Sequence, residues 1–372
     1  MSIIVVLKTK QDSKNVYNNT KKIINMLGGM KKFVKKNDKV LIKPNIVSPI
    51  EESVTDFNII RAVVDEVKKC KAIPYIGENS GFEFSTEQTF KILKVNELAK
   101  KFDVKLVNFE KSKKLKKVKV PYLKHFEIPA EVLDSDVIIN IPKMKMHNLT
   151  IITAAMKNIM GILNRENRRR MHMHDIDLSI VDLNRVIRPN LTIVDALSIR
   201  SKAVFGKSYN LNAIIAGTNS IDIDKFCCKL MNINYKHVKY IRKASKMGSK
   251  NIKIIGDKVK PLPFSLENPL FTRKIFSIFF WAMHSIDYIY SRFTNKSLIP
   301  LYNFFFGIRP VIVKSKFRGN ESYIDICPVN AINPKKKNIK YNRCMYVRCL
   351  KCFRNCKDGS IILKKGFRRV KC

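Results

Sequence analysis

Acidic residues are scarce in this sequence, which also lacks the marks of secreted, membrane-spanning and fibrous chains. Asp and Glu number 30 against 72 Lys and Arg in 372 residues, a net charge of +42. With 13 Gly, 14 Pro and 45% hydrophobic residues, disordered and collagen-like chains are excluded. No apolar run approaches the roughly 20 residues of a spanning helix, and the start, MSIIVVLKTKQDSK, is unlike a signal peptide. We expect a cytoplasmic globular protein with two domains, or one large domain and an appendage.

The excess of positive charge predicts an anionic partner, because net charge governs association more than fold. Nucleic acid, an acidic membrane face and an acidic redox partner all satisfy this expectation. A codon bias towards Lys, Asn and Ile in an AT-rich genome is an alternative source of much of the excess. That bias does not by itself explain the low number of acids.

Short apolar runs alternate with helix-length amphipathic segments over residues 1–258. Helical spacing of apolar residues marks Thr55 to Lys71, Thr86 to Phe102 and Asp222 to Asn232. The alternation predicts an α/β domain with a mostly parallel sheet and flanking helices. The runs expected to form strands are SIIVVLK (2–8), KVLIKPN (39–45), IPYIGEN (73–79), VKLVNF (104–109), DVIINIPK (136–143), LTIVDAL (191–197), NAIIAGT (212–218) and IKIIGD (252–257).

Residues 259–308 are predicted to form an aromatic helical linker. The stretch 270–308 is rich in Phe, Trp and Tyr and begins with one long amphipathic helix. In one interpretation this helix lies in a membrane interface, held there by its aromatic residues and basic flanks. In the favoured interpretation it is an interdomain helix that packs onto the α/β domain through Phe276, Phe280 and Met283.

Polar side chains follow the carboxyl ends of several predicted strands. In open parallel sheets, ligands bind in the crevice beyond these ends. Lysines there would hold a carboxylate or phosphate, while Glu, His and Asp would act as acid–base groups or bind a cation. Single polar residues also end strands simply because chain ends meet water, so only the whole set supports a site. Its members are Lys43, Asn45, Glu78, Lys143, Lys145, His147, Asp195, Thr218 and Asn219.

Lys157 and Asn158 lie in the segment TAAMKNIMGILN. We expect them to open or line the next helix, with Gly161 allowing close packing. A lysine in an apolar helix is also explained by a side chain that reaches out to water.

Five of the nine cysteines lie within residues 327–356, which predicts a metal centre in a chain without a secretion signal. Cys349-x-x-Cys352-x-x-x-Cys356 matches the latter part of the bacterial ferredoxin pattern, and Cys327-Pro matches the end of its companion motif. In that pattern the Cys-Pro thiolate binds the cluster of the other motif. We expect residues 309–372 to form a small ferredoxin-like α+β domain, with one 4Fe-4S cluster bound by Cys327, Cys344, Cys349 and Cys352.

The cysteine pattern is incomplete. The first three cysteine positions of the companion motif are occupied by Phe317, Asn320 and Tyr323, so its cluster is lost. Tyr346 stands where the second motif should begin, and Cys344 comes two residues early. Cys356 is then either an orphan or a substitute ligand. A four-thiolate zinc site and a degenerate domain without metal stay open as alternatives.

Nearly the whole chain resembles the domain-of-unknown-function family numbered 362, in its version with a C-terminal ferredoxin-like domain. The resemblance implies an α/β domain coupled to iron–sulfur chemistry, without a known reaction. It also implies Asp224 as a further site residue. The motifs that carry it are LIKPN (Lys43, Asn45), TD (Thr55, Asp56), GENSG (77–81), IPKMKMH (Lys143, Lys145, His147), MKNIMG (Lys157, Asn158, Gly161), LTIVDA (Asp195) and AGTNSIDID (Asp224).

The leading hypothesis is a cytoplasmic iron–sulfur redox protein, either an oxidoreductase or an electron-transfer protein. Lys43, Lys143 and Lys145 would clamp an anionic substrate, and His147 would donate a proton. Residues 309–372 hold 18 Lys and Arg against three acids, so an acidic ferredoxin or flavodoxin would dock there. Whether the chain is an enzyme stays open.

The alternative hypothesis is a basic nucleic-acid or anionic-surface binding protein with a structural cluster or zinc. Basic runs at Arg168–Arg170, Lys335–Lys337 and Lys364–Lys371 support it, although no recognised nucleic-acid motif accompanies them. A third hypothesis, a redox subunit at the membrane periphery, depends on residues 270–308.

Overall fold

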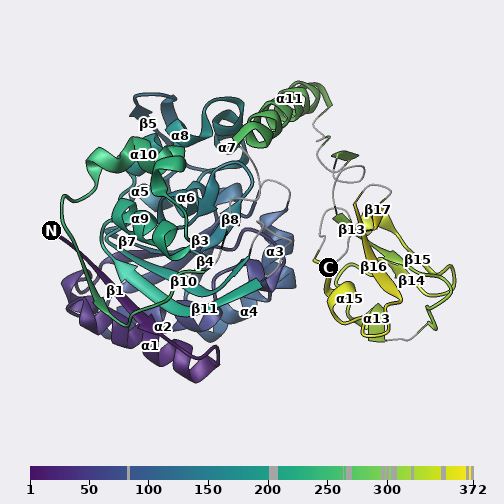
Figure 1. Cartoon of the computed structure of the whole chain (residues 1–372), viewed down its shortest axis with the longest axis horizontal. Helices are drawn as coiled ribbons and strands as arrows, with labels where there is room; N and C mark the ends of the chain where they lie inside the picture. The colour runs from purple at the N-terminus through teal and green to yellow at the C-terminus, as the bar shows by residue number, and fades with distance from the viewer. Residues whose placement is uncertain are drawn as a thin grey trace.

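In the computed structural model, an α/β unit is followed by a long helix and a small C-terminal module (Figure 1). We call the unit before residue 258 the α/β domain and the elements from residue 308 onward the C-terminal module. The exact domain boundaries stay predictions. The residues described are 1–81, 84–200, 208–262, 264, 270–294, 298, 301–302, 308–319, 322–344, 349–365 and 368–369.

An eight-stranded sheet forms the centre of the α/β domain. Its strands lie in the order β12 (Ile252–Gly256), β1 (Ser2–Lys8), β11 (Ser208–Gly217), β10 (Leu191–Arg200), β7 (Val137–Ile141), β2 (Lys39–Pro44), β3 (Ile73–Glu78) and β4 (Lys105–Asn108). β11 pairs antiparallel with β1 and β10, and the other neighbours pair in parallel. The mostly parallel sheet is confirmed, and each of these strands overlaps a predicted run, although β10 and β11 extend beyond theirs.

Helices cover both faces of the sheet, because successive side chains of a strand point to opposite sides. In β1, Ile4 and Val6 pack into one core, whereas Val5 and Leu7 pack into the other. Figure 1 shows α1 and α2 on one face and α6, α8, α9 and α10 on the other. The bounds of these helices are α1 Ser13–Met26, α2 Phe57–Lys69, α6 Ala155–Asn158, α8 Ile176–Val186, α9 Ser220–Leu230 and α10 Lys239–Ala244.

The helix expected from Thr86 to Phe102 is two short helices, α3 (Thr86–Ile92) and α4 (Val95–Lys101). Lys94 between them has a φ of 56°, in the left-handed region. A residue in that region interrupts the right-handed path of a helix. The apolar spacing runs through this break, which is why the sequence alone indicated one helix.

Two hairpins were not predicted from the sequence. One pairs β5 (Leu115–Val120) with β6 (Lys124–Pro129), and the other pairs β8 (Lys145–His147) with β9 (Ile151–Thr153). The strands of the second hairpin have three residues each. So short a strand is below the length at which alternation becomes recognisable.

The long helix α11 (Leu270–Thr294) packs on α7 (Arg165–Met173). Of the side chains expected to face the core, Phe280 and Met283 are half-buried. The side chain of Phe276 lies outside the described residues. Within the ranges that the structure describes, no helix has the length and hydropathy needed to cross a bilayer.

The C-terminal module has a small core of its own, in which Phe317 packs with Ile332, Cys352 and Ile361. Phe317 stands at an expected cysteine position and is 2% exposed, so an apolar side chain occupies that place. Asn320, Tyr346 and the side chain of Tyr323 lie outside the described residues. The elements of the module are β13 (Ile308–Ile312), α13 (Ser322–Asp325), β14 (Ile332–Asn333), β15 (Asn338–Ile339), α14 (Tyr341–Cys344), α15 (Lys351–Arg354), β16 (Ile361–Lys365) and β17 (Arg368–Arg369).

The α/β domain also contains the short helix α5 (Ala130–Leu133).

A substitution at Gly77 would test how tightly side chains pack against the centre of β3. A Cβ at this position would lie 2.2 Å from Phe109 Cζ and 2.9 Å from Leu41 Cδ1. We expect Gly77→Ala to lower the free energy of unfolding by about 1–3 kcal/mol through overpacking, measured by urea denaturation. Adding Phe109→Leu should make the Gly77→Ala change less costly. An unchanged cost in that background would show that the contact with Phe109 is not responsible.

Candidate functional site

A buried ion pair lies at the carboxyl ends of β2 and β3. Lys43 Nζ is 2.8 Å from Glu78 Oε2, and the two side chains are 0% and 2% exposed. The backbone N–H groups of Ile46 and Asn79 each donate to one oxygen of Glu78. Burial lowers the pKa of Lys43 and raises that of Glu78, while their mutual attraction opposes both shifts.

Gly161 makes room for this pair. A Cβ on Gly161 would lie 2.0 Å from Glu78 Oε1 and 2.7 Å from Lys43 Nζ. Its carbonyl also accepts a hydrogen bond from Asn79 N at 2.8 Å. The expectation that Gly161 allows close packing is confirmed, and the neighbour it admits is the ion pair.

A second ion pair lies beyond the end of β7. Lys143 Nζ is 2.9 Å from Asp195 Oδ1, and both side chains are buried. The other oxygen of Asp195 accepts a hydrogen bond from Asp56 N at 2.8 Å. Two of the three lysines expected to clamp an anion are therefore neutralised by carboxylates of the protein itself.

Lys145 is held by a relay of amide side chains. Lys145 Nζ donates to Asn45 Oδ1 at 2.8 Å and to the Ser53 carbonyl at 2.9 Å. Asn45 Nδ2 donates to Asn158 Oδ1 at 2.8 Å. Asn158 in turn donates to Asn140 Oδ1 at 2.8 Å. The relay orients the ammonium group of Lys145 without neutralising it.

Lys145 and Lys157 are cations of this region for which the described residues supply no ion pair. Burial, together with repulsion from Lys157 and Lys143, lowers the pKa of Lys145 to about 7. Burial likewise lowers the pKa of Lys157 to about 8, with Arg168 adding to the shift. Two poorly hydrated ammonium groups that repel each other form a place where an anion would be stabilised.

His147 has a defined tautomer when neutral. Its Nδ1 accepts hydrogen bonds from Leu149 N at 3.2 Å and Thr150 N at 3.3 Å. An accepting Nδ1 leaves the ring proton on Nε2. The half-buried imidazole thus presents Nε2–H as a donor.

Asp224 lies apart from the strand-end set. Its carboxylate accepts hydrogen bonds from Ala155 N at 2.6 Å and Met156 N at 3.1 Å, at the start of α6. Burial raises its pKa to about 7. Because α6 carries Lys157 and Asn158, Asp224 positions the helix that bears two site residues.

Thr218 and Asn219 were expected at the same edge, and this expectation is wrong. β11 runs antiparallel to β10, and Gly217 pairs with Thr192 near the start of β10. The end of β11 therefore lies at the opposite edge of the sheet. Asn219 there accepts from the first amides of α9 as its N-cap.

Arg168 was missed by sequence reasoning, which placed it in a solvated basic run. It is 6% exposed and donates to the Ser80 carbonyl and to Asn79 Oδ1. Arg169 is also buried, and it forms an ion pair with Asp287 at 2.9 Å. A run of adjacent arginines in the sequence indicated side chains exposed on the surface. In the structure Arg168 instead supports the loop after β3, and Arg169 supports α11.

The four cysteines expected to bind a cluster lie near one another. Burial raises the pKa of the Cys352 thiol, and the neighbouring Cys344, Cys349 and Cys327 raise it further. The Ala331 backbone N–H donates to Cys327 Sγ at 3.2 Å. Such donors to sulfur are typical of cysteine ligands. In the part of the chain that the structure describes, however, no three or more His, Cys, Asp or Glu side chains are already arranged around a metal position.

Cys356 has a different environment. Its Sγ donates to Asp358 Oδ1 at 3.0 Å and accepts from Ile361 N at 3.1 Å. These contacts turn the thiol towards its own loop. Of the two roles left open for Cys356, its donation to Asp358 favours a thiol that is not a ligand, because a ligating sulfur gives up that proton.

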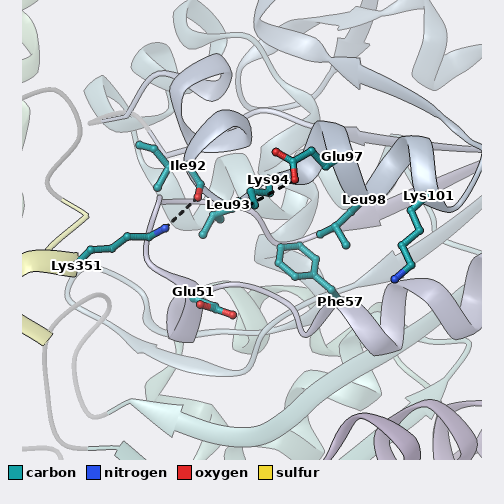
Figure 2. A pocket seen from close by; sticks show the side chains of 9 residues that line it. All are labelled: Glu51, Phe57, Ile92, Leu93, Lys94, Glu97, Leu98, Lys101 and Lys351. Atoms are coloured by element: carbon teal, nitrogen blue, oxygen red, sulfur yellow. Dashed lines mark hydrogen bonds and ion pairs between the residues drawn. The ribbon is translucent and has the colours of Figure 1, made fainter. Parts of the chain in front are cut away.

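α15 connects the C-terminal module to the α/β domain. Arg354 Nη1 is 2.6 Å from Glu52 Oε2, and Lys351 Nζ donates to the Ile92 carbonyl at 3.3 Å. Figure 2 shows Lys351 reaching Ile92 beside a cavity of about 350 Å³. Glu52 lies in η2 (Glu51–Ser53), the turn whose Ser53 carbonyl also accepts from Lys145. One short turn therefore contacts both the cysteine-bearing module and the buried lysine.

Replacing Glu78 by Gln should show how much the buried pair matters. Glu78→Gln leaves Lys43 charged, buried and unpaired, and we expect the free energy of unfolding to fall by about 3–5 kcal/mol, measured by urea denaturation near neutral pH. The loss should shrink as the pH rises, because an unpaired Lys43 gives up its proton more readily. The matched control is Glu97→Gln, whose exposed pair with Lys94 is 3.8 Å long and should contribute less than about 1 kcal/mol. Equal losses in the two variants would contradict the special role of the buried pair.

Comparison with known proteins gives three findings. The family model described as Domain of unknown function (DUF362) matches residues 40–229, a range that holds all the strand-end residues above. A relative from Synechocystis sp., "Thylakoid-associated protein sll1697", is 27% identical over 184 residues, covering 47% of this chain and 56% of the relative. This chain thus matches little more than half the length of that relative. The lactate racemase apoprotein from Thermoanaerobacterium thermosaccharolyticum is similar with a TM-score of 0.43 and 14% identity, over 62% of this chain and 57% of that one.

Proposed function

This chain belongs to the DUF362 family, whose defining domain has no assigned function, and we propose that it is a cytoplasmic iron–sulfur redox protein acting on an anionic substrate or partner. The observation that carries the proposal is the packing of Cys327 and Cys352 in one small core, with Cys344 and Cys349 near enough to affect the pKa of Cys352. A single bound 4Fe-4S cluster would supply one-electron transfer at a potential tuned by hydrogen bonds to its sulfurs. The residues that would hold it are Cys327, Cys344, Cys349 and Cys352.

The donor set fits such a centre on chemical grounds. Thiolates are the ligands of iron–sulfur clusters, and the backbone N–H beside Cys327 would stabilise negative charge on its sulfur. The surrounding module is strongly basic, with 18 Lys and Arg against three acids in residues 309–372, which would offset the negative charge of the thiolates. Zinc is the competing occupant, because four thiolates also suit a structural zinc site.

The contacts of η2 support communication between the cysteine-bearing module and the strand-end site. Arg354, two residues after Cys352, pairs with Glu52, and the adjacent Ser53 carbonyl accepts from Lys145. Cys349 itself is buried against Ile92 of the α/β domain. These contacts bring the cysteine-bearing module against the same turn that contacts Lys145.

Lys145 and Lys157 would hold the anionic group of a substrate, a carboxylate or a phosphate. Lys43 and Lys143 would position the surrounding loops, because Glu78 and Asp195 already neutralise them. His147 would serve as proton donor through Nε2–H, which its own loop orients. This assignment differs from the expected clamp of Lys43, Lys143 and Lys145. Lys43 and Lys143 now position the loops, and Lys157 joins Lys145 in binding the anion.

An acidic electron carrier, such as a ferredoxin or flavodoxin, would dock on the C-terminal module. Lys335–Lys337 are exposed there, and charge complementarity of this kind accelerates association between redox partners. The basic run at Arg168–Arg170 contributes less to any such surface, because Arg168 and Arg169 are buried.

Metal analysis with two cysteine variants tests the cluster. Anaerobically purified protein should contain about four iron and four acid-labile sulfide per chain and give an electron paramagnetic resonance signal after dithionite. Cys349→Ser should lose both iron and signal, because it removes one of four ligands. Cys356→Ser is the matched control and should keep them. Zinc in place of iron, or no metal, would overturn the redox proposal and favour a binding protein with a basic surface.

The anion site should depend on pH. Below pH 7 both Lys145 and Lys157 are protonated, and above pKa values of about 7 and 8 they lose their charge. Each lost charge should weaken anion binding by up to about tenfold per pH unit. We therefore expect inorganic phosphate to raise the melting temperature more near pH 6 than near pH 9.

Lys145→Met should remove most of the phosphate-dependent rise in melting temperature near pH 6. Lys119→Met, at an exposed lysine of β5, is the control and should retain it. A phosphate effect of equal size in both variants, or one that does not change with pH, would place the anion elsewhere.

A further inference from the structure

α11 presents an apolar stripe to solvent. Ile278, Ile286 and Ile289 are each about 60% exposed, and Phe293 is 86% exposed. At 3.6 residues per turn, these positions fall on one side of the helix. Large apolar side chains gathered on one exposed surface mark a site of interaction with a protein or a membrane.

The opposite side of α11 is fastened to α7 by polar contacts. Asp287 Oδ2 accepts from Arg169 at 2.9 Å, and the ring of His284 stacks on His172 with 5.0 Å between centroids. His284 and Asp287 are 2% and 1% exposed. These contacts fix the rotation of α11 about its axis, so its stripe faces away from the α/β domain, consistent with the projecting position of α11 in Figure 1.

The borders of the stripe have the composition of a membrane interface. Trp281 is about half exposed and Tyr290 about a third, and such aromatic side chains favour the headgroup region of bilayers. Arg292 is exposed near the end of the helix. Asp287 is the single acid in the sequence of α11, and it is turned inward to Arg169. The outward surface is therefore apolar and aromatic, with positive charge at its border.

We propose that α11 is an interfacial anchor whose stripe inserts into the surface of a membrane containing anionic lipid. A helix of this kind lies in the plane of the interface, and its binding combines apolar burial with attraction to anionic headgroups. The net charge of +42 favours a lipid surface over a second copy of the chain, because two such copies repel each other. The proposal stands on α11 alone and does not require the cysteine centre.

The single tryptophan of the chain makes the test direct. Trp281 is the only Trp in the sequence, and it borders the stripe. Mixing the full-length protein with vesicles of equal parts phosphatidylcholine and phosphatidylglycerol should shift its emission to shorter wavelength and protect it from iodide. The protein should also sediment with these vesicles. Sedimentation without a change in emission would mean that charge alone attaches the protein, and the proposal would fail.

Paired substitutions separate insertion from general attraction. Ile286→Glu with Ile289→Glu should weaken vesicle binding by about tenfold or more, since it places two charges in the apolar contact. The matched control is Ile73→Glu with Ile254→Glu, which changes two exposed isoleucines on β3 and β12 and should bind as the unchanged protein does. Phe293→Glu alone provides a second stripe variant should the pair disturb folding, as judged by circular dichroism.

Two other outcomes would overturn the proposal. Equal vesicle binding by the stripe variants and the control would show that the stripe of α11 does not contact the membrane. A dimer in sedimentation velocity that Ile286→Glu with Ile289→Glu dissociates, without vesicle binding by the unchanged protein, would assign the stripe to a second copy of the chain.

Discussion

The pairing of Lys43 with Glu78 is the constraint on which the strand-end region depends. Taking both charges out of water costs several kcal/mol each, so the pair is tolerable only with close geometry and further hydrogen bonds. The amides after β2 and β3 supply those bonds to Glu78, and the absence of a Cβ at Gly161 supplies the space. Two loops and the segment η4 (Ile159–Ile162) are thus held in one arrangement.

The sheet was readable from the sequence, whereas the assignment of charges was not. Continuous apolar runs predict buried strands such as β7 and β10, and this local pattern is enough to locate them. The direction of β11 depends on its partners, so Thr218 was placed at the wrong edge. The sequence likewise shows Lys43 after a strand without showing that Glu78 neutralises it, and adjacent arginines look alike whether buried or solvated. Partners distant in the chain decide each of these cases.

At one position where the sequence pattern expects a cysteine, the C-terminal module has apolar packing instead. Phe317 fills the core where a first cysteine would stand, and Cys352 belongs to the same core. A small domain has little apolar area to stabilise it and gains from a bound metal. Cys352 therefore contributes to the apolar packing of the module, and its burial raises the pKa of its thiol.

The turn η2 contacts both the C-terminal module and the strand-end region of the α/β domain. Glu52 holds Arg354 of the module, and the next residue, Ser53, holds Lys145 of the buried site. A displacement of this turn alters both contacts together. If an anion binds Lys145 as proposed, its binding and the contact between Glu52 and Arg354 would be thermodynamically linked. A change in the affinity of one caused by the other would then be matched by an equal change in the opposite direction of influence.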